Sequence, residues 1–158
     1  MRQYTKKIIG IVFLLLSFNI YALSLSEDAI ERGISETCAS YLNQVEKSYN
    51  LSGLNITFAH PENPALLPSL HISSQKYNNG SSIFSATLTP DEEYCYISTV
   101  LVTSVNNQTC SEISLLKLGV NPELQSSSYA DGNFTIITPQ DNTYQIILTT
   151  QGKTGCAM

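Results

Sequence analysis

The sequence has no tryptophan and is poor in charged residues and in histidine. Of its 158 residues none is Trp, 13% are Asp, Glu, Lys or Arg, and two are His. The absence of tryptophan disfavours a cleft that stacks aromatic rings on sugars. Two histidines leave little material for histidine-dependent catalysis or metal binding. What remains is a chain rich in Ser, Thr, Asn and Tyr, which predicts a neutral-polar surface.

Basic residues are few after the first seven positions of the chain. Three of the eight Lys and Arg lie in the first seven residues, so the rest of the chain has 5 − 13 = −8 formal charges. Nucleic acids and anionic membrane surfaces are bound through clustered Lys and Arg. The charge balance therefore argues against both as partners.

Residues 1–22 have the layout of a secretory signal peptide. Arg2, Lys6 and Lys7 precede an apolar run from Ile8 to Phe18, and Ala22 follows as a small residue suited to cleavage. The apolar run is about 11 residues long, shorter than the roughly 20 that cross a bilayer as a helix. We expect cleavage after Ala22, a periplasmic or secreted mature chain and no stable membrane span after removal of the signal.

The alternative is an uncleaved anchor that continues through Leu23 and Leu25. Such an anchor would have to bury the polar side chain of Asn19 in the bilayer.

The four cysteines all lie in the mature part of the chain: Cys38, Cys95, Cys110 and Cys156. An even number of cysteines in an exported chain predicts two disulfides. No C-x-x-C is present, and no flanking His or Lys lowers a thiol pKa, so a redox pair is disfavoured. His60 and His71 match no compact zinc-ligand spacing. We therefore predict structural disulfides, and neither a metal site nor a cofactor.

Helical periodicity is strongest near the start of the mature chain. Apolar residues recur there in steps of three and four, which predicts one long amphipathic helix over Ser24–Asn50 with Cys38 on its inward face. Ser24 and Glu27 form a capping box at its start. Thr109 and Glu112 form a second capping box, which predicts a short helix over Cys110–Leu118.

The remainder of the chain has the alternation and turn residues of strands. The predicted strands are Leu54–Ala59, Ser69–Lys76, Ser82–Thr89, 94–105, Leu124–Ala130, Phe134–Thr138 and Thr143–Thr150. No internal repeat is visible in the sequence. The elements predict a single disulfide-stabilised α+β domain over residues 23–158. In it the long helix packs on an antiparallel sheet of about six or seven strands, with one short helix. A small β-barrel is the alternative.

Residues 94–105 are apolar on both faces, which predicts a central strand covered on both sides. A straight strand over 95–105 separates its ends by about 33 Å. Residues 106–110 reach back at most ~17 Å. Since a disulfide needs Cα atoms within about 7 Å, a bond between Cys95 and Cys110 is disfavoured.

Two disulfide pairings then remain. One joins Cys38 to Cys95 and Cys110 to Cys156, and the other joins Cys38 to Cys110 and Cys95 to Cys156. We favour the first, because Cys38 faces inward from the helix and Cys95 projects from a strand expected to lie beneath it.

No catalytic set is recognisable in the sequence, and we predict no catalytic residue. No serine lies in a G-x-S-x-G elbow. His60 precedes Pro61 in a loop, and His71 lies within a strand. The acidic run 91–93 lacks the spaced oxygen ligands of a calcium loop. The enzymatic alternative is a secreted hydrolase that uses dispersed carboxylates or His71, and a secreted effector is a further alternative.

We therefore expect a small exported protein that acts by binding another protein. An inhibitor or immunity-type partner, or an accessory component of an envelope complex, fits this description. Seven tyrosines follow the predicted signal peptide. Tyrosine suits partner surfaces, and it suits sheet faces equally well.

Overall fold

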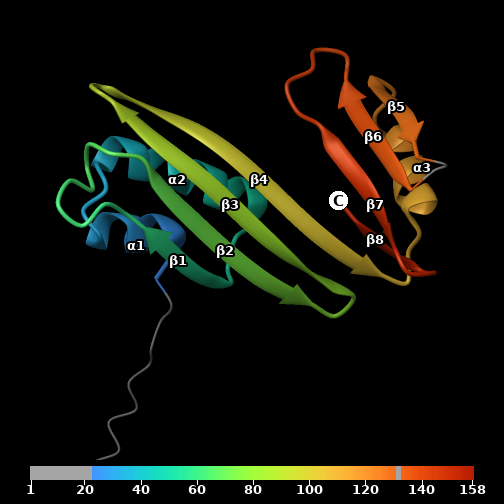
Figure 1. The fold of residues 1–158 in the computed structure, drawn as a ribbon, viewed down its shortest axis with the longest axis horizontal. Coiled ribbons are helices and arrows are strands. Elements are labelled where there is room, and N and C mark those ends of the chain that lie inside the picture. The colour runs from blue at the N-terminus through green and yellow to red at the C-terminus, as the bar shows by residue number, and fades with distance from the viewer. Residues whose placement is uncertain (1–22, 131–132) are drawn as a thin grey trace, which may run out of the picture.

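The computed structural model describes residues 23–130 and 133–158, so the predicted signal peptide lies outside the described residues (Figure 1). Within these ranges the chain forms three helices and eight strands. The helices are α1 (Leu25–Glu31), α2 (Glu36–Tyr49) and α3 (Cys110–Val120). The strands are β1 (Leu54–Phe58), β2 (Ser69–Tyr77), β3 (Gly80–Asp91), β4 (Tyr94–Asn106), β5 (Leu124–Tyr129), β6 (Phe134–Pro139), β7 (Ile146–Gln151) and β8 (Gly155–Ala157). The α+β class predicted from the sequence is confirmed.

The prediction of one long helix over Ser24–Asn50 is wrong, because the chain turns between α1 and α2. Gly33 has a φ of 84°. Its N–H donates to the carbonyl of Ile30, and the N–H of Ile34 donates to that of Ala29. These two bonds end α1 in a Schellman motif, which favours glycine in the left-handed conformation. Ser35 then caps α2 by accepting a hydrogen bond from the Cys38 N–H at 3.3 Å.

A buried carboxylate holds the start of α1 against α2. Glu46 of α2 accepts hydrogen bonds from the backbone N–H groups of Leu25 and Ser26 at 2.7 and 3.3 Å, and from the Ser26 hydroxyl at 2.9 Å. These N–H groups have no partner within α1, and the positive end of the helix dipole favours an anion there. The interaction fixes α1 beside α2.

The eight strands form one antiparallel sheet with the order β1-β2-β3-β4-β8-β7-β6-β5. Among the described strands β1 and β5 each have a single neighbour, so the sheet is open and the barrel alternative is wrong. The sheet exceeds the six or seven strands expected. The additional strand is β8, which has three residues and pairs with both β4 and β7.

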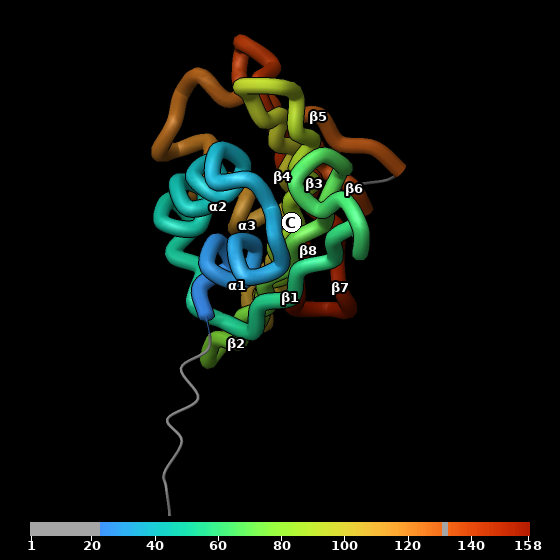
Figure 2. The backbone as a smooth tube through the Cα atoms, turned by 90° about the vertical axis from the view of Figure 1, so that its left-hand side faces the viewer, coloured from blue at the N-terminus to red at the C-terminus, as the bar shows by residue number. Residues whose placement is uncertain are grey.

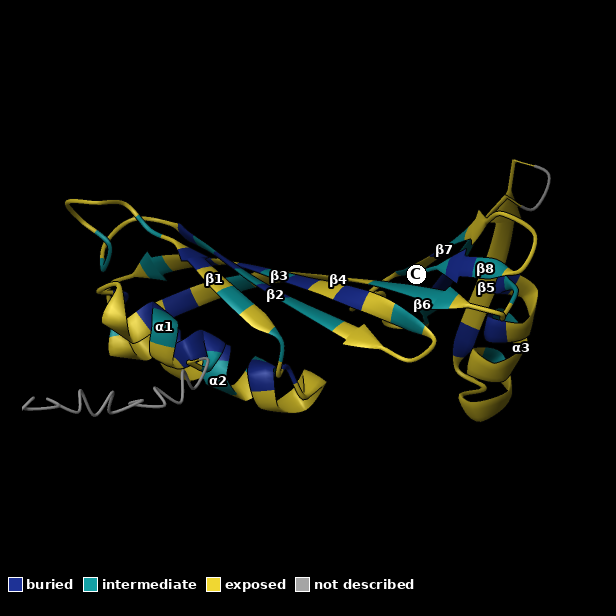
Figure 3. Ribbon diagram, turned by 90° about the horizontal axis from the view of Figure 1, so that it is seen from below, coloured by how far each residue is buried: buried dark blue, intermediate teal, exposed yellow. Residues whose placement is uncertain are grey.

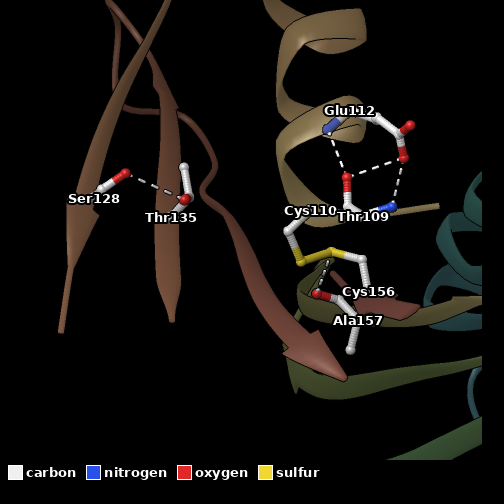
Figure 4. Close-up of a disulfide and its surroundings, with 7 residues drawn as sticks. All are labelled: Thr109, Cys110, Glu112, Ser128, Thr135, Cys156 and Ala157. Carbon is white, nitrogen blue, oxygen red and sulfur yellow. Dashed lines mark hydrogen bonds between the residues drawn. A yellow bond between two sulfur atoms is a disulfide. The ribbon is translucent and has the colours of Figure 1, made fainter. Parts of the chain in front are cut away.

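The same order of elements occurs twice along the chain. A helix followed by four consecutive antiparallel strands forms first α2 and β1–β4, then α3 and β5–β8. We call these the first unit, which also includes α1, and the second unit. In both, a disulfide joins the first turn of the helix to the fourth strand: Cys38–Cys95 and Cys110–Cys156, with Cα separations of 5.1 and 5.0 Å. Figure 4 shows the bond between Cys110 and Cys156. This is the pairing that we favoured from the sequence.

Each unit buries its own hydrophobic cluster between its helices and its strands. In the first unit the cluster includes Leu25, Leu42, Phe84 and Leu88. In the second it includes Ile113, Ile137 and Leu148 together with the two cysteines of its disulfide. The units meet where the fourth strands pair antiparallel, with Ser104–Asn106 of β4 opposite Gly155–Ala157 of β8. From either outer edge of the sheet to its centre, the strands of a unit therefore follow one another in sequence order, from the first to the fourth.

Helices α1 and α2 lie on one side of the first unit's strands (Figures 2 and 3). The prediction that residues 94–105 form a strand covered on both faces is therefore wrong in part. The cluster beneath the helices reaches Cys95 and Ile97. Beyond them Val100, Leu101 and Val102 are 59%, 37% and 46% exposed, although they alternate between the two faces. The strand lies centrally in the sheet order, but β8 pairs with only its last three residues.

We predict that each disulfide contributes about 2 to 4 kcal/mol to the free energy of unfolding, because each closes a long loop in the unfolded chain. Replacing Cys110 and Cys156 together by alanine should lower the unfolding free energy by that amount in urea titrations. Replacing Cys38 and Cys95 together should have a similar effect. Peptide mapping without reductant should recover the 38–95 and 110–156 links, and a 95–110 link would contradict the structure.

Candidate functional site

His71 is the histidine that the sequence offered as a catalytic candidate, and the structure buries it completely. Its side chain lies beneath the helices of the first unit and is 0% exposed. Its Nδ1 lies 3.1 Å from the Thr57 hydroxyl, and its Nε2 lies 2.8 Å from the Ser69 hydroxyl. A neutral imidazole has one donor and one acceptor, so one hydroxyl donates to the ring and the other accepts from it.

Burial lowers the pKa of His71 from 6.5 to about 4, and the Asp28 carboxylate opposes part of that change. The imidazole is therefore neutral at pH 7, with both nitrogens occupied by hydroxyls of the protein itself. A general base needs contact with the group that it deprotonates. His71 has no such access, and its arrangement is that of a satisfied core histidine.

His60 lies in the loop between β1 and β2 and has a different task. Its Nδ1 accepts hydrogen bonds from the backbone N–H groups of Glu62 and Asn63, both at 3.2 Å. The ring thereby shapes the proline-rich loop. The two histidines thus make separate sets of contacts, and neither bonds to a carboxylate in the described chain.

Metal and thiol chemistry find little support in the residues that the structure describes. Among them no group of three His, Cys, Asp or Glu side chains is placed to hold a metal ion. All four cysteines are in disulfides. No helix within 23–130 and 133–158 is long and apolar enough to cross a membrane.

The feature that remains is the sheet face opposite α1 and α2, which we call the open face. Phe84, Ala86 and Leu88 of β3 point toward the helices and are at most 1% exposed. Their neighbours in the strand therefore point the other way. Ile83 is one of these neighbours, and it is 53% exposed.

The register aligns apolar side chains across the open face. Residues paired across antiparallel strands share a face. One row runs from Leu54 through Ser74 and Ile83 to Val102, and the next from Ile56 through Ile72 and Ser85 to Val100. Six large apolar side chains on this face are between 39% and 65% exposed: Leu54, Ile56, Phe58, Ile83, Val100 and Val102. Strands β1, β3 and β4 contribute to them.

Tyrosine adds to this surface at one end. Tyr94 and Tyr96 of β4 are 66% and 65% exposed and lie on the same face as Val100 and Val102. All seven tyrosines in the described ranges are exposed. The sequence pattern predicted that Tyr94 and Tyr96 lie on a strand. It did not show that one face of the sheet would have no covering layer.

We predict a pH dependence of stability that arises from His71. Because its folded pKa is about 4 and its ordinary value is 6.5, the unfolded chain binds a proton first as the pH falls. The contribution is complete above pH ~6.5 and is lost toward pH ~4, where the unfolding free energy should have decreased by about 2 to 3 kcal/mol. Urea titrations across this range measure the slope.

His71→Gln should remove this component of the slope. His60→Gln is the matched control, since it changes an exposed histidine and should preserve the slope of the unmodified protein. Equal slopes for the unmodified protein and His71→Gln would contradict the assignment.

No family model matches this chain, and no curated protein or solved structure is similar to it, so likeness to known proteins assigns it to no family.

Proposed function

We propose that this protein is an exported binding protein that acts by attaching to another protein through the open face. The observation that carries the proposal is the uncovered apolar surface over β1–β4. Large apolar side chains exposed together on one face are typical of sites where proteins associate. Exposed tyrosines with an apolar ring and a polar tip are enriched in the same sites.

The chemistry of the surface favours a protein over other partners. The open face has aliphatic side chains in rows and few charges, with Lys76 and Asp91 at its margins. Nucleic acid requires clustered positive charge, which the chain lacks. An inhibitor or immunity-type protein, or an accessory component of an envelope complex, would use such a face.

Two intramolecular disulfides are consistent with an exported location, where an oxidising environment preserves them. The hydrolase alternative finds no support at His71, which is buried and has both ring nitrogens bonded to hydroxyls of the protein. Substituting His60 or His71 should accordingly leave partner binding unchanged in a folded variant. Protein binding therefore has more support than hydrolysis at His71.

We predict that a lysine on the open face weakens capture of the partner. Val100→Lys and Ile83→Lys each place a charge within the apolar rows, and loss of a hot-spot residue near the centre of an interface costs about 2 kcal/mol or more. Affinity capture from an envelope extract, quantified against the unmodified protein, should show a loss of affinity of about tenfold or more.

Gln44→Lys is the matched control, because Gln44 is exposed on α2, on the opposite side of the sheet. It introduces the same charge and should capture the partner at the original level. A protein that captures no stoichiometric partner, or that captures one equally well in all variants, would contradict the proposal.

A further inference from the structure

The long strand β4 has a free edge along most of its length. On one side it pairs with β3 from Tyr94 to Val105. On the other side only Ser104–Asn106 pair with β8. One further pair of bonds joins Thr103 to Met158, whose N–H and carbonyl groups exchange hydrogen bonds at 2.9 and 2.6 Å. In Figure 1 the far end of β4 runs away from the second unit beyond this point.

These bonds identify which backbone groups face the free edge. Along an antiparallel strand the N–H and C=O groups of alternate residues point to opposite sides. The backbone N–H and C=O of Thr103 point toward the β8 side of the strand. The backbone N–H and C=O groups of Leu101, Thr99, Ile97 and Cys95 therefore point to the same side. In the described chain none of these four residues has a backbone hydrogen-bond partner there.

The edge also lacks two kinds of residue that normally protect one. Proteins discourage strand pairing at free edges with proline, lysine, or a covering helix or loop. The stretch from Tyr94 to Val102 contains no proline and no charged residue, and it is apolar on both faces. The two outer edges of the sheet differ from it: β5 presents mainly Gln125 and serines, which gain little from burial, and β1 has only five residues.

We propose that an extended segment of the protein partner pairs with the free edge of β4 and adds a strand in line with β8. The inference deepens the proposed function and depends on it. The added strand would run antiparallel to β4, in the direction that β8 and Met158 already take. Strand addition of this kind satisfies the backbone groups of both chains at once.

The side chains bordering the edge indicate what the segment carries. Tyr96, Val100 and Val102 border it on the open face, and Ile97 and Leu101 border it on the helix side. Since successive residues of a strand point to opposite faces, the segment buries apolar side chains at adjacent positions. β-branched residues fit such a position best.

The turn at the far end of the edge adds charge selectivity. Asp91, Glu92 and Glu93 connect β3 to β4, and all three are exposed. A strand antiparallel to β4 directs its C-terminal end toward this turn. We therefore assign to the segment a Lys or Arg just beyond its paired residues, where opposite charges attract at low ionic strength.

A second copy of the chain fits the edge less well. Pairing β4 with β4 of another copy would place the acidic turn of each copy beside the Met158 end of the other's β8. Both copies also carry the same net negative charge. Sedimentation would detect such a dimer.

The test uses a synthetic probe, a peptide of about eight alternating valine and threonine residues followed by two lysines, long enough to span the free edge. Fluorescence anisotropy of the labelled peptide measures its binding to the folded, oxidised protein. Thr99→Pro removes an N–H that faces the edge and leaves the bonds to β3 intact, so it should weaken peptide binding about tenfold or more.

Ser126→Pro is the matched control on the free edge of β5. Thr150 donates to the Asn133 carbonyl, so by alternation Ser126 faces away from β6. This variant should bind the peptide as the unmodified protein does. Glu92→Lys with Glu93→Lys should weaken binding and reduce its dependence on salt. Thermal unfolding identifies any variant that fails to fold.

Several results would overturn the inference. One is equal binding by Thr99→Pro, and another is retained binding of a peptide N-methylated at the residues facing β4. Absence of peptide binding at any salt concentration would also overturn it. A dimer that Thr99→Pro converts to a monomer in sedimentation would replace the partner segment with a second copy. If Val100→Lys abolishes partner capture while Thr99→Pro preserves it, the proposed function stands and strand addition fails.

Discussion

The constraint on which the rest of the structure depends is the unequal length of the two strands that meet at the centre of the sheet. β4 has 13 residues and β8 has three. A short partner satisfies only the end of a long strand, so the remaining backbone groups of β4 face outward without a ladder. The same mismatch keeps the second unit away from the middle of β4. The free edge follows from this inequality, whereas the apolar face is exposed because the described chain places α1 and α2 on the other side of the first unit's strands (Figure 3).

The two disulfides compensate for small cores. Each unit buries one modest cluster between its helices and four strands, and its disulfide joins the helix start to the strand farthest along the meander. That bond connects α2 to β4 in the first unit and α3 to β8 in the second, pairs of elements that backbone hydrogen bonds do not join. Glu46 performs a related task inside the first unit, because it binds the start of α1 to α2.

The parts of this fold that sequence reasoning recovers are those specified by local chemistry. The capping boxes at Ser24 and Thr109 are present, since each needs only a hydroxyl and a glutamate three residues later. The break at Gly33 was missed because the apolar stripe continues on both sides of it. The strand β8 has too few residues to show alternation. The exposure of Val100 could not be predicted from the sequence. Apolar periodicity predicts that a strand has an apolar face, but it does not show whether another layer covers that face.

The order of the cysteines has a consequence for how the chain matures. The bonded cysteines are consecutive in the sequence, so the 38–95 loop closes before the 110–156 loop begins. In a chain that becomes accessible from its N-terminus, Cys95 is accessible before Cys110. The first thiol that Cys38 meets is therefore its native partner, and oxidation in order of emergence yields the correct pairs without reshuffling. The repeated arrangement of helix and meander thus permits folding to proceed one unit at a time.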